Sequence, residues 1–166
     1  FTEPPVTCSA PLSPGDSPDL HAQDTIVAGA GLVDPAMARL LTAEGPAAVR
    51  ALAELGAPFD RRADGGFAQG LEAAHGRPRV ARVGGDQAGA AIMGAVIAAV
   101  LAAPHIRVLS GHRLRALLQD AHGRVRGVVA EQDGELLEIT APATVLATGG
   151  IGGLYAVTTN PRELRG

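Results

Sequence analysis

The chain has 166 residues, a formal net charge of −3 and 46% apolar residues, enough for one domain with a hydrophobic core. All 14 basic residues are arginines, which excludes lysine Schiff-base chemistry and the lysine-dependent P-loop within this sequence. No basic cluster longer than an arginine pair occurs, so nucleic acid is not expected as a main partner. The single cysteine, Cys8, permits no internal disulfide and fits a reducing, cytoplasmic location.

Capping signals predict helices in the first third of the chain. Residues 1–15 are rich in Pro, Ser and Thr without periodicity, so we expect an irregular segment. Ser17-Pro18-Asp19 then predicts a helix to about Gly29 that buries Leu20, Ile26 and Val27. Asp34-Pro35 predicts a second helix, broken at Gly45-Pro46 and continued as a third over residues 47–55.

A long aperiodic segment is followed by an apolar helix. Residues 57–85 contain many Arg and Gly, and such long loops are often functional. Residues 86–103 are expected to form a helix that ends before Pro104. Its apolar run, residues 88–103, carries no charge but is shorter than the roughly 20 residues of a spanning helix. We therefore predict a buried helix of a soluble protein rather than a membrane span.

The last third has the alternation and turns of a β-meander. Strands are expected at residues 106–109, 114–118, 125–130 and 136–140, with turns at residues 121–124 and at Asp133-Gly134. Residues 143–147 form an apolar run that leads into Gly149-Gly150 and is typical of a central strand of a parallel sheet. Its parallel partners are not recognisable in this sequence. The predicted fold class is therefore α+β, an incomplete domain of an α/β family.

Five segments, in order, resemble motifs of the L-aspartate oxidase family, which is related to the flavoprotein subunits of succinate dehydrogenase and fumarate reductase. They are residues 16–25 (DS-x-x-x-H-x-x-DT), 28–34 (AGAGL-x-D), 71–79 (similar to EGGHS-x-x-R), 145–150 (VLATGG) and 158–161 (TTNP). The resemblance covers about residues 10–166. It implies that residues 16–166 are a partial FAD-binding domain with Ala-rich helices, a β-meander and one strand of a parallel sheet.

The resemblance also implies an activity and its residues. A complete relative oxidises L-aspartate to iminoaspartate with FAD, the first step of NAD biosynthesis. The implied catalytic residues are Glu72, His75 and Arg79. A carboxylate there can hold a substrate ammonium group, and an arginine can neutralise a substrate carboxylate. The expected partner is thus a small molecule, L-aspartate or another dicarboxylate.

Cofactor contacts are expected in the second half. Glycines after an apolar strand let the backbone approach a phosphate at the carboxyl edge of an α/β sheet. The implied FAD-binding residues are Arg113, Leu114, Ala147, Thr148, Gly149, Gly150 and Asn160. The histidines show no metal-ligand spacing, and no metal site is expected. Asp16 and Asp19 are interpreted as capping rather than catalytic residues.

Departures from the family pattern leave alternatives open. No GxGxxG turn is present, Val6-Thr7 stands where the family has Gly-Gly against the flavin, and Ala73-Ala74 and Gly76 alter the EGGHS segment. The sequence therefore predicts a central fragment of an oxidase that is inactive alone. One alternative is a remnant that binds no FAD. Another is a fumarate- or succinate-type oxidoreductase, although the AGAGL run favours the aspartate branch.

Overall fold

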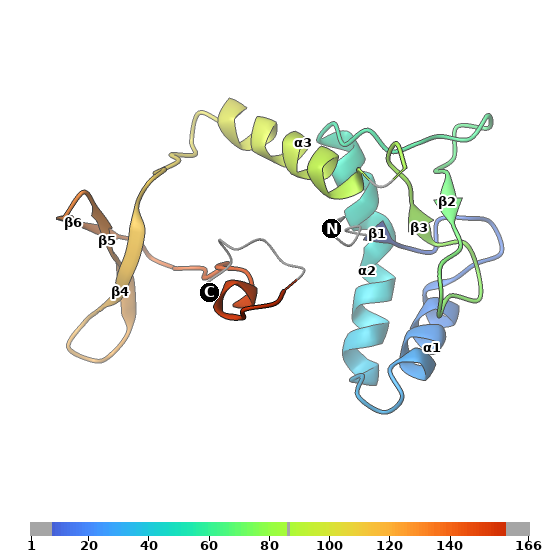
Figure 1. Ribbon diagram of the computed structural model, residues 1–166, viewed down its shortest axis with the longest axis horizontal. Coiled ribbons are helices and arrows are strands. Elements are labelled where there is room, and N and C mark those ends of the chain that lie inside the picture. The colour runs from blue at the N-terminus through green and yellow to red at the C-terminus, as the bar shows by residue number, and fades with distance from the viewer. Residues whose placement is uncertain (1–7, 86, 159–166) are drawn as a thin grey trace. The chain divides into compact units, whose positions relative to one another are not determined.

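The computed structural model describes residues 8–85 and 87–158, which divide into two compact units, residues 8–106 and residues 107–158. The described residues contain three α-helices and two three-stranded antiparallel sheets. All three helices belong to the first unit, and the larger sheet belongs to the second (Figure 1). The α+β fold class is confirmed. The smaller sheet lies in the first unit beside the helices.

Helix α1 (Pro18–Ala28) begins where the capping signal predicts it. The Ser17 hydroxyl accepts a hydrogen bond from the backbone N–H of Leu20 at 3.2 Å, and Pro18 occupies the first helical turn. The expected buried set is wrong: Leu20 and Val27 are exposed. The helix instead buries His21 and Ala22, and Ile26 is partly buried.

Helix α2 (Pro35–Glu54) is continuous, so the predicted break at Gly45-Pro46 is wrong. Asp34 caps its start with a hydrogen bond to the N–H of Ala36 at 2.8 Å. Pro46 removes one helical hydrogen bond, but Thr42 and Val49 on either side of it are buried. Tertiary packing of that face therefore outweighs the local cost of the proline. Helices α1 and α2 pack side by side (Figure 1).

The smaller sheet joins segments that the sequence presents as irregular. Strands β1 (Cys8–Ser9), β3 (Val80–Ala81) and β2 (Gln69–Gly70) pair antiparallel in the order β1-β3-β2. The prediction of irregular chain is thus wrong for these residues. Each strand has only two residues, which is too short to show an alternating pattern.

The core of this unit is built largely from small side chains. Its larger members include Val49, Phe59 and Ile92, and the rings of Phe59 and Phe67 meet edge-to-face with centroids 5.7 Å apart. The core draws on α2, β3, the loops before β2 and the start of α3.

Helix α3 (Ala88–Ala102) forms within the predicted range but is not fully buried. Ala88 and Ile92 are buried, whereas Met93, Ile97 and Leu101 are at least half exposed. The helix has apolar residues on every side, but the other described residues of its unit bury only the side that carries Ala88 and Ile92. No helix among residues 8–85 and 87–158 is long and apolar enough to cross a membrane.

The meander of the second unit is confirmed. Strands β4 (Arg113–Gln119), β5 (Val125–Gln132) and β6 (Glu135–Thr140) pair antiparallel in chain order. Asp133 and Gly134 both have positive φ, 52° and 85°, as a two-residue hairpin turn requires. Gly127 has φ +150°, and a Cβ there would lie 2.0 Å from the carbonyl oxygen of Ile139 on β6.

Two predicted strands do not form among the described residues. Residues 106–109 and 143–147 are irregular, and Val145 and Leu146 are 87% and 57% exposed. An apolar run becomes a strand only when neighbouring strands accept and donate its backbone hydrogen bonds. No described residue supplies them here.

Candidate functional site

A buried arginine joins three segments of the first unit. The Arg79 side chain, directly before β3, is 1% exposed. Its Nε and Nη2 donate to the two carboxylate oxygens of Asp16 at 2.8 and 3.0 Å, and its Nη1 donates to Oδ2 of Asp24 at 2.6 Å. Asp16 precedes α1 and Asp24 lies within it, so the guanidinium ties α1 to the segment that follows Glu72.

The charges in this cluster support one another. Burial opposes ionisation of Asp16, but hydrogen bonds from Arg79 and from the Ser17 N–H outweigh it and lower the pKa of its carboxyl. Hydrogen bonds from Arg79 and the Gly76 N–H lower the pKa of Asp24. Both carboxylates are therefore ionised at neutral pH, and two negative groups compensate one buried cation.

Glu72 stands on a turn that the same cluster holds. The His75 N–H donates to the Glu72 carbonyl at 3.2 Å, and the Gly76 N–H donates to Oδ2 of Asp24 at 2.7 Å. Ala74 has φ +72°, a conformation that favours glycine, and it occupies the second glycine position of the EGGHS pattern. Glu72 is exposed, and its carboxylate has no hydrogen bond or ion pair with another described residue.

Two histidines lie beside the arginine. The rings of His21 and His75 are 5.2 Å apart, and His75 places Nδ1 3.4 Å from Arg79 Nη1 and Nε2 3.4 Å from Ser9 Oγ. A guanidinium only donates, so Nδ1 of His75 can accept from Arg79 only in the tautomer that carries its proton on Nε2.

His21 is buried next to a positive charge. Its Nδ1 has no hydrogen-bond partner among the described residues. Burial, followed by the charges of Arg79 and His75, lowers the pKa of the His21 imidazole, against a smaller opposing effect of Asp16 and Asp24. His21 is therefore neutral at neutral pH.

The sequence-predicted residues fall into two groups. Glu72, His75 and Arg79 lie together in the first unit, whereas Arg113, Leu114 and residues 147–150 belong to the second. Asn160 and the Val6-Thr7 pair lie outside the described residues. The sequence did not predict that Asp16 and Asp24 are the partners of Arg79. The signal that could have indicated it is that both aspartates belong to the first motif, residues 16–25.

The glycine segment of the second unit offers backbone donors. Residues 147–150 are exposed, Gly149 has φ +75°, and a Cβ on Gly150 would meet nothing within 4 Å. The N–H groups of Thr148, Gly149 and Gly150 donate to no other described residue. Free N–H groups in an open glycine segment fit the phosphate groups of a dinucleotide. Arg113 and Leu114 lie on β4, paired with Glu131 and Ala130 of β5.

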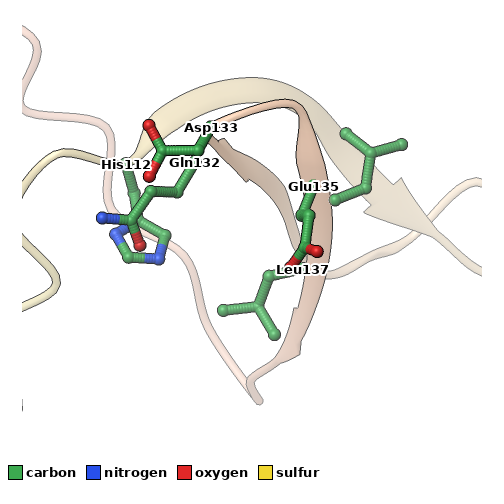
Figure 2. Close-up of a pocket in the computed structure, with 6 residues that line it drawn as sticks. His112, Gln132, Asp133, Glu135 and Leu137 are labelled. Carbon is green, nitrogen blue, oxygen red and sulfur yellow. The ribbon is translucent and has the colours of Figure 1, made fainter.

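A pocket of about 480 Å³ lies at the β5–β6 turn (Figure 2). It is lined by His112, Gln132, Asp133, Glu135, Leu136 and Leu137. The carboxylates of Asp133 and Glu135 make it unsuited to phosphate. No group of three or more His, Cys, Asp or Glu in the described part of the chain is arranged to hold a metal ion.

Comparison with known proteins decides the family. Residues 6–166 match the family model described as FAD binding domain, which is nearly the whole chain. The chain belongs to this family. FAD is accordingly the cofactor of the complete relatives.

The similarity extends along the chain but over a minor part of each relative. L-aspartate oxidase of Caulobacter vibrioides is 66% identical over 158 residues, 95% of this chain and 31% of that protein. Sdh1 of Mycobacterium smegmatis in complex with UQ1 is 32% identical with a TM-score of 0.83, over 95% of this chain and 29% of that one. A quinol-fumarate reductase with menaquinol molecules is 28% identical with a TM-score of 0.88, over 98% and 28%. This FAD binding domain chain therefore spans about a third of the length of the relatives it matches.

Proposed function

We propose that the chain is part of an FAD-dependent L-aspartate oxidase that converts L-aspartate to iminoaspartate for NAD biosynthesis in the cytoplasm. The observation that carries the proposal is the 66% identity to L-aspartate oxidase of Caulobacter vibrioides over 158 residues. The exposed carboxylate of Glu72, which has no partner among the described residues, supports it chemically. The small-molecule substrate is an amino acid with two carboxylates, and an unpaired carboxylate attracts its ammonium group.

The residues of the turn have separate parts in this proposal. Glu72 orients the substrate through its ammonium group. Arg79 is buried between two carboxylates, which suits a residue that fixes the turn. The Arg77 side chain is 49% exposed and can reach a substrate carboxylate more readily than Arg79. His75 is half-buried, and its Nδ1 lies 3.4 Å from Nη1 of Arg79.

FAD fits the backbone donors of the second unit. Residues 147–150 would hold its phosphate groups through free N–H groups, with Arg113, Leu114 and Asn160 as further contacts. When bound, the flavin supplies the acceptor for the hydride that leaves the substrate Cα. The chain's own contribution is to bind and orient the amino acid and to exclude water from the reacting carbon.

A chimera tests the proposal. Residues 1–166 would replace the matching third of the Caulobacter vibrioides enzyme, and FAD absorbance and L-aspartate-dependent hydrogen peroxide formation would be measured. We expect a yellow protein that oxidises L-aspartate, and a Glu72→Gln chimera that keeps FAD but loses at least about tenfold in kcat/KM. A chimera that folds without binding FAD would establish the remnant alternative and refute the proposal.

A dicarboxylate oxidoreductase is the second candidate, because the matching solved structures include a quinol-fumarate reductase. The two candidates differ in the charge that faces the substrate. Succinate and fumarate have no ammonium group, so the free carboxylate of Glu72 would repel them. The same chimera assayed for oxidation of succinate separates the candidates. Oxidation of succinate at a rate above that of L-aspartate would favour the second.

A further inference from the structure

One carboxylate oxygen of Asp24 accepts two hydrogen bonds. Its Oδ2 accepts from Arg79 Nη1 at 2.6 Å and from the Gly76 N–H at 2.7 Å. These donors stand 55 and 52 residues away in the sequence. The oxygen therefore fixes the end of the Glu72–Gly76 turn against α1. The Asp24 side chain is 30% exposed, so it is accessible to the solvent side of the cluster, unlike Asp16 at 2%.

The hydrogen bond between the Asp24 carboxylate and the turn depends on the residue at position 76. A Cβ on Gly76 would lie 3.0 Å from Asp24 Oδ2, tighter than most real Cβ contacts. Glycine thus leaves room for the carboxylate to sit against the backbone N–H. Two hydrogen bonds constrain the turn: His75 N–H to the Glu72 carbonyl within it, and Gly76 N–H to Asp24 outside it. Loss of the second would leave the turn attached through β3, Arg79 and the contact of the His75 ring with Ser9.

We propose that Asp24 is a positioning residue that holds the Glu72–Gly76 turn on α1, so that the Glu72 carboxylate is presented to the ammonium group of the amino-acid substrate. The part of this inference that concerns the substrate rests on the proposed function. The part that concerns the attachment of the turn to α1 does not. The Glu72 side chain has no hydrogen bond or ion pair with another described residue. Its position is therefore set by the backbone of the turn, and Asp24 holds that backbone against α1 at Gly76. Asp24 acts through the turn and touches no substrate.

The attachment is tested on the full 166-residue chain without cofactor or substrate. The amide proton of Gly76, followed by NMR from pH 7 to pH 2, should shift as the Asp24 carboxylate is protonated. Asp24→Asn should abolish that shift. Asp16→Asn loosens Arg79 from its other side but leaves the acceptor for Gly76, so it should keep the shift. A Gly76 amide that titrates equally in wild type and Asp24→Asn would overturn the proposal.

The presentation of Glu72 is tested in the chimera described above. Asp24→Ala, which removes the acceptor for the Gly76 N–H, should raise KM for L-aspartate about tenfold and change kcat by less than about twofold, because a disordered turn weakens a contact made in the bound ground state. Thr25→Val is the matched control, since Thr25 is next on α1 and donates only to the His21 carbonyl. Equal KM changes in both variants, or none in Asp24→Ala, would refute the positioning role. A chimera without substitutions that is inactive would refute the proposed function. The titration of the Gly76 amide would still test whether Asp24 attaches the turn to α1.

Discussion

Replacement of Ala74 by glycine should stabilise the first unit. Ala74 holds φ +72°, and an alanine in the left-handed region is less stable by about 1–2 kcal/mol. Glycine removes that strain but loses about 0.4–1 kcal/mol through the greater freedom of the unfolded chain. The expected net gain is therefore about 0–1.6 kcal/mol, with a midpoint of about 0.8 kcal/mol. For the first unit, residues 8–106, the midpoint raises Tm by about 3–6 °C.

Ala73 provides the matched control for this prediction. It is the adjacent exposed alanine, and it is not among the residues with positive φ. Ala73→Gly should therefore lower stability by about 0.4–1 kcal/mol, opposite in sign to Ala74→Gly. Circular dichroism at 222 nm reports this unit selectively, because all three described α-helices belong to it. Equal shifts of Tm in the same direction for both variants would refute the assignment of strain to Ala74.

Three further predictions follow from buried and close contacts. Arg79→Ala leaves buried Asp16 with only the Arg77 guanidinium, whose Nε lies 4.0 Å away, and should destabilise the first unit by up to about 3–5 kcal/mol in urea unfolding. Burial lowers the pKa of His21 in the folded state, so folding favours the neutral imidazole. This stabilisation is present above the unfolded pKa of about 6.5 and is lost as the pH falls through the lowered pKa. The urea concentration at the unfolding midpoint should therefore decrease from pH 7.5 to pH 5.5, and should decrease less in His21→Leu. Gly127→Ala would place a Cβ 2.0 Å from the carbonyl oxygen of Ile139 and should destabilise the meander by about 1–3 kcal/mol or more, seen as faster amide exchange in β5 and β6.

Each of these predictions has an outcome that contradicts it. An Arg79→Ala chain as stable as wild type would mean that Asp16 is solvated rather than buried. A pH dependence unchanged in His21→Leu would assign the titration to another group. Protection of β5 and β6 retained in Gly127→Ala would show that the hairpin backbone can shift without loss of its hydrogen bonds.

The exposed apolar side of α3 predicts self-association of the isolated chain. Met93, Ile97 and Leu101 recur every four residues along one side of the helix and are each at least half exposed. Ile97→Glu should increase the monomer fraction in sedimentation velocity, whereas Ala102→Glu, at another exposed position of the helix, should have less effect. A wild-type chain that is monomeric at high concentration would contradict this prediction.

Local signals in the sequence were sufficient for several elements. Ser17-Pro18 starts α1, the apolar run gives the extent of α3, and Asp133-Gly134 turns the meander. Each of these is decided by residues within a few positions of one another, through caps, side-chain composition or turn dihedral angles. The ordered motifs likewise identified the FAD binding domain family and its α+β class, which the family match and the fold confirm.

Contacts between distant segments decided the rest. The sequence could not show that α2 continues through Pro46, because the stabilising face is completed by other segments. Nor could it pair Arg79 with Asp16 and Asp24, which lie 63 and 55 residues away. An ion pair between distant segments produces no local pattern in the sequence of either segment. Its energy depends on burial and on the distance between the charges, and both are established only by folding. The sequence thus determined the family and the local elements, and the tertiary structure decided which carboxylates hold the turn that carries Glu72.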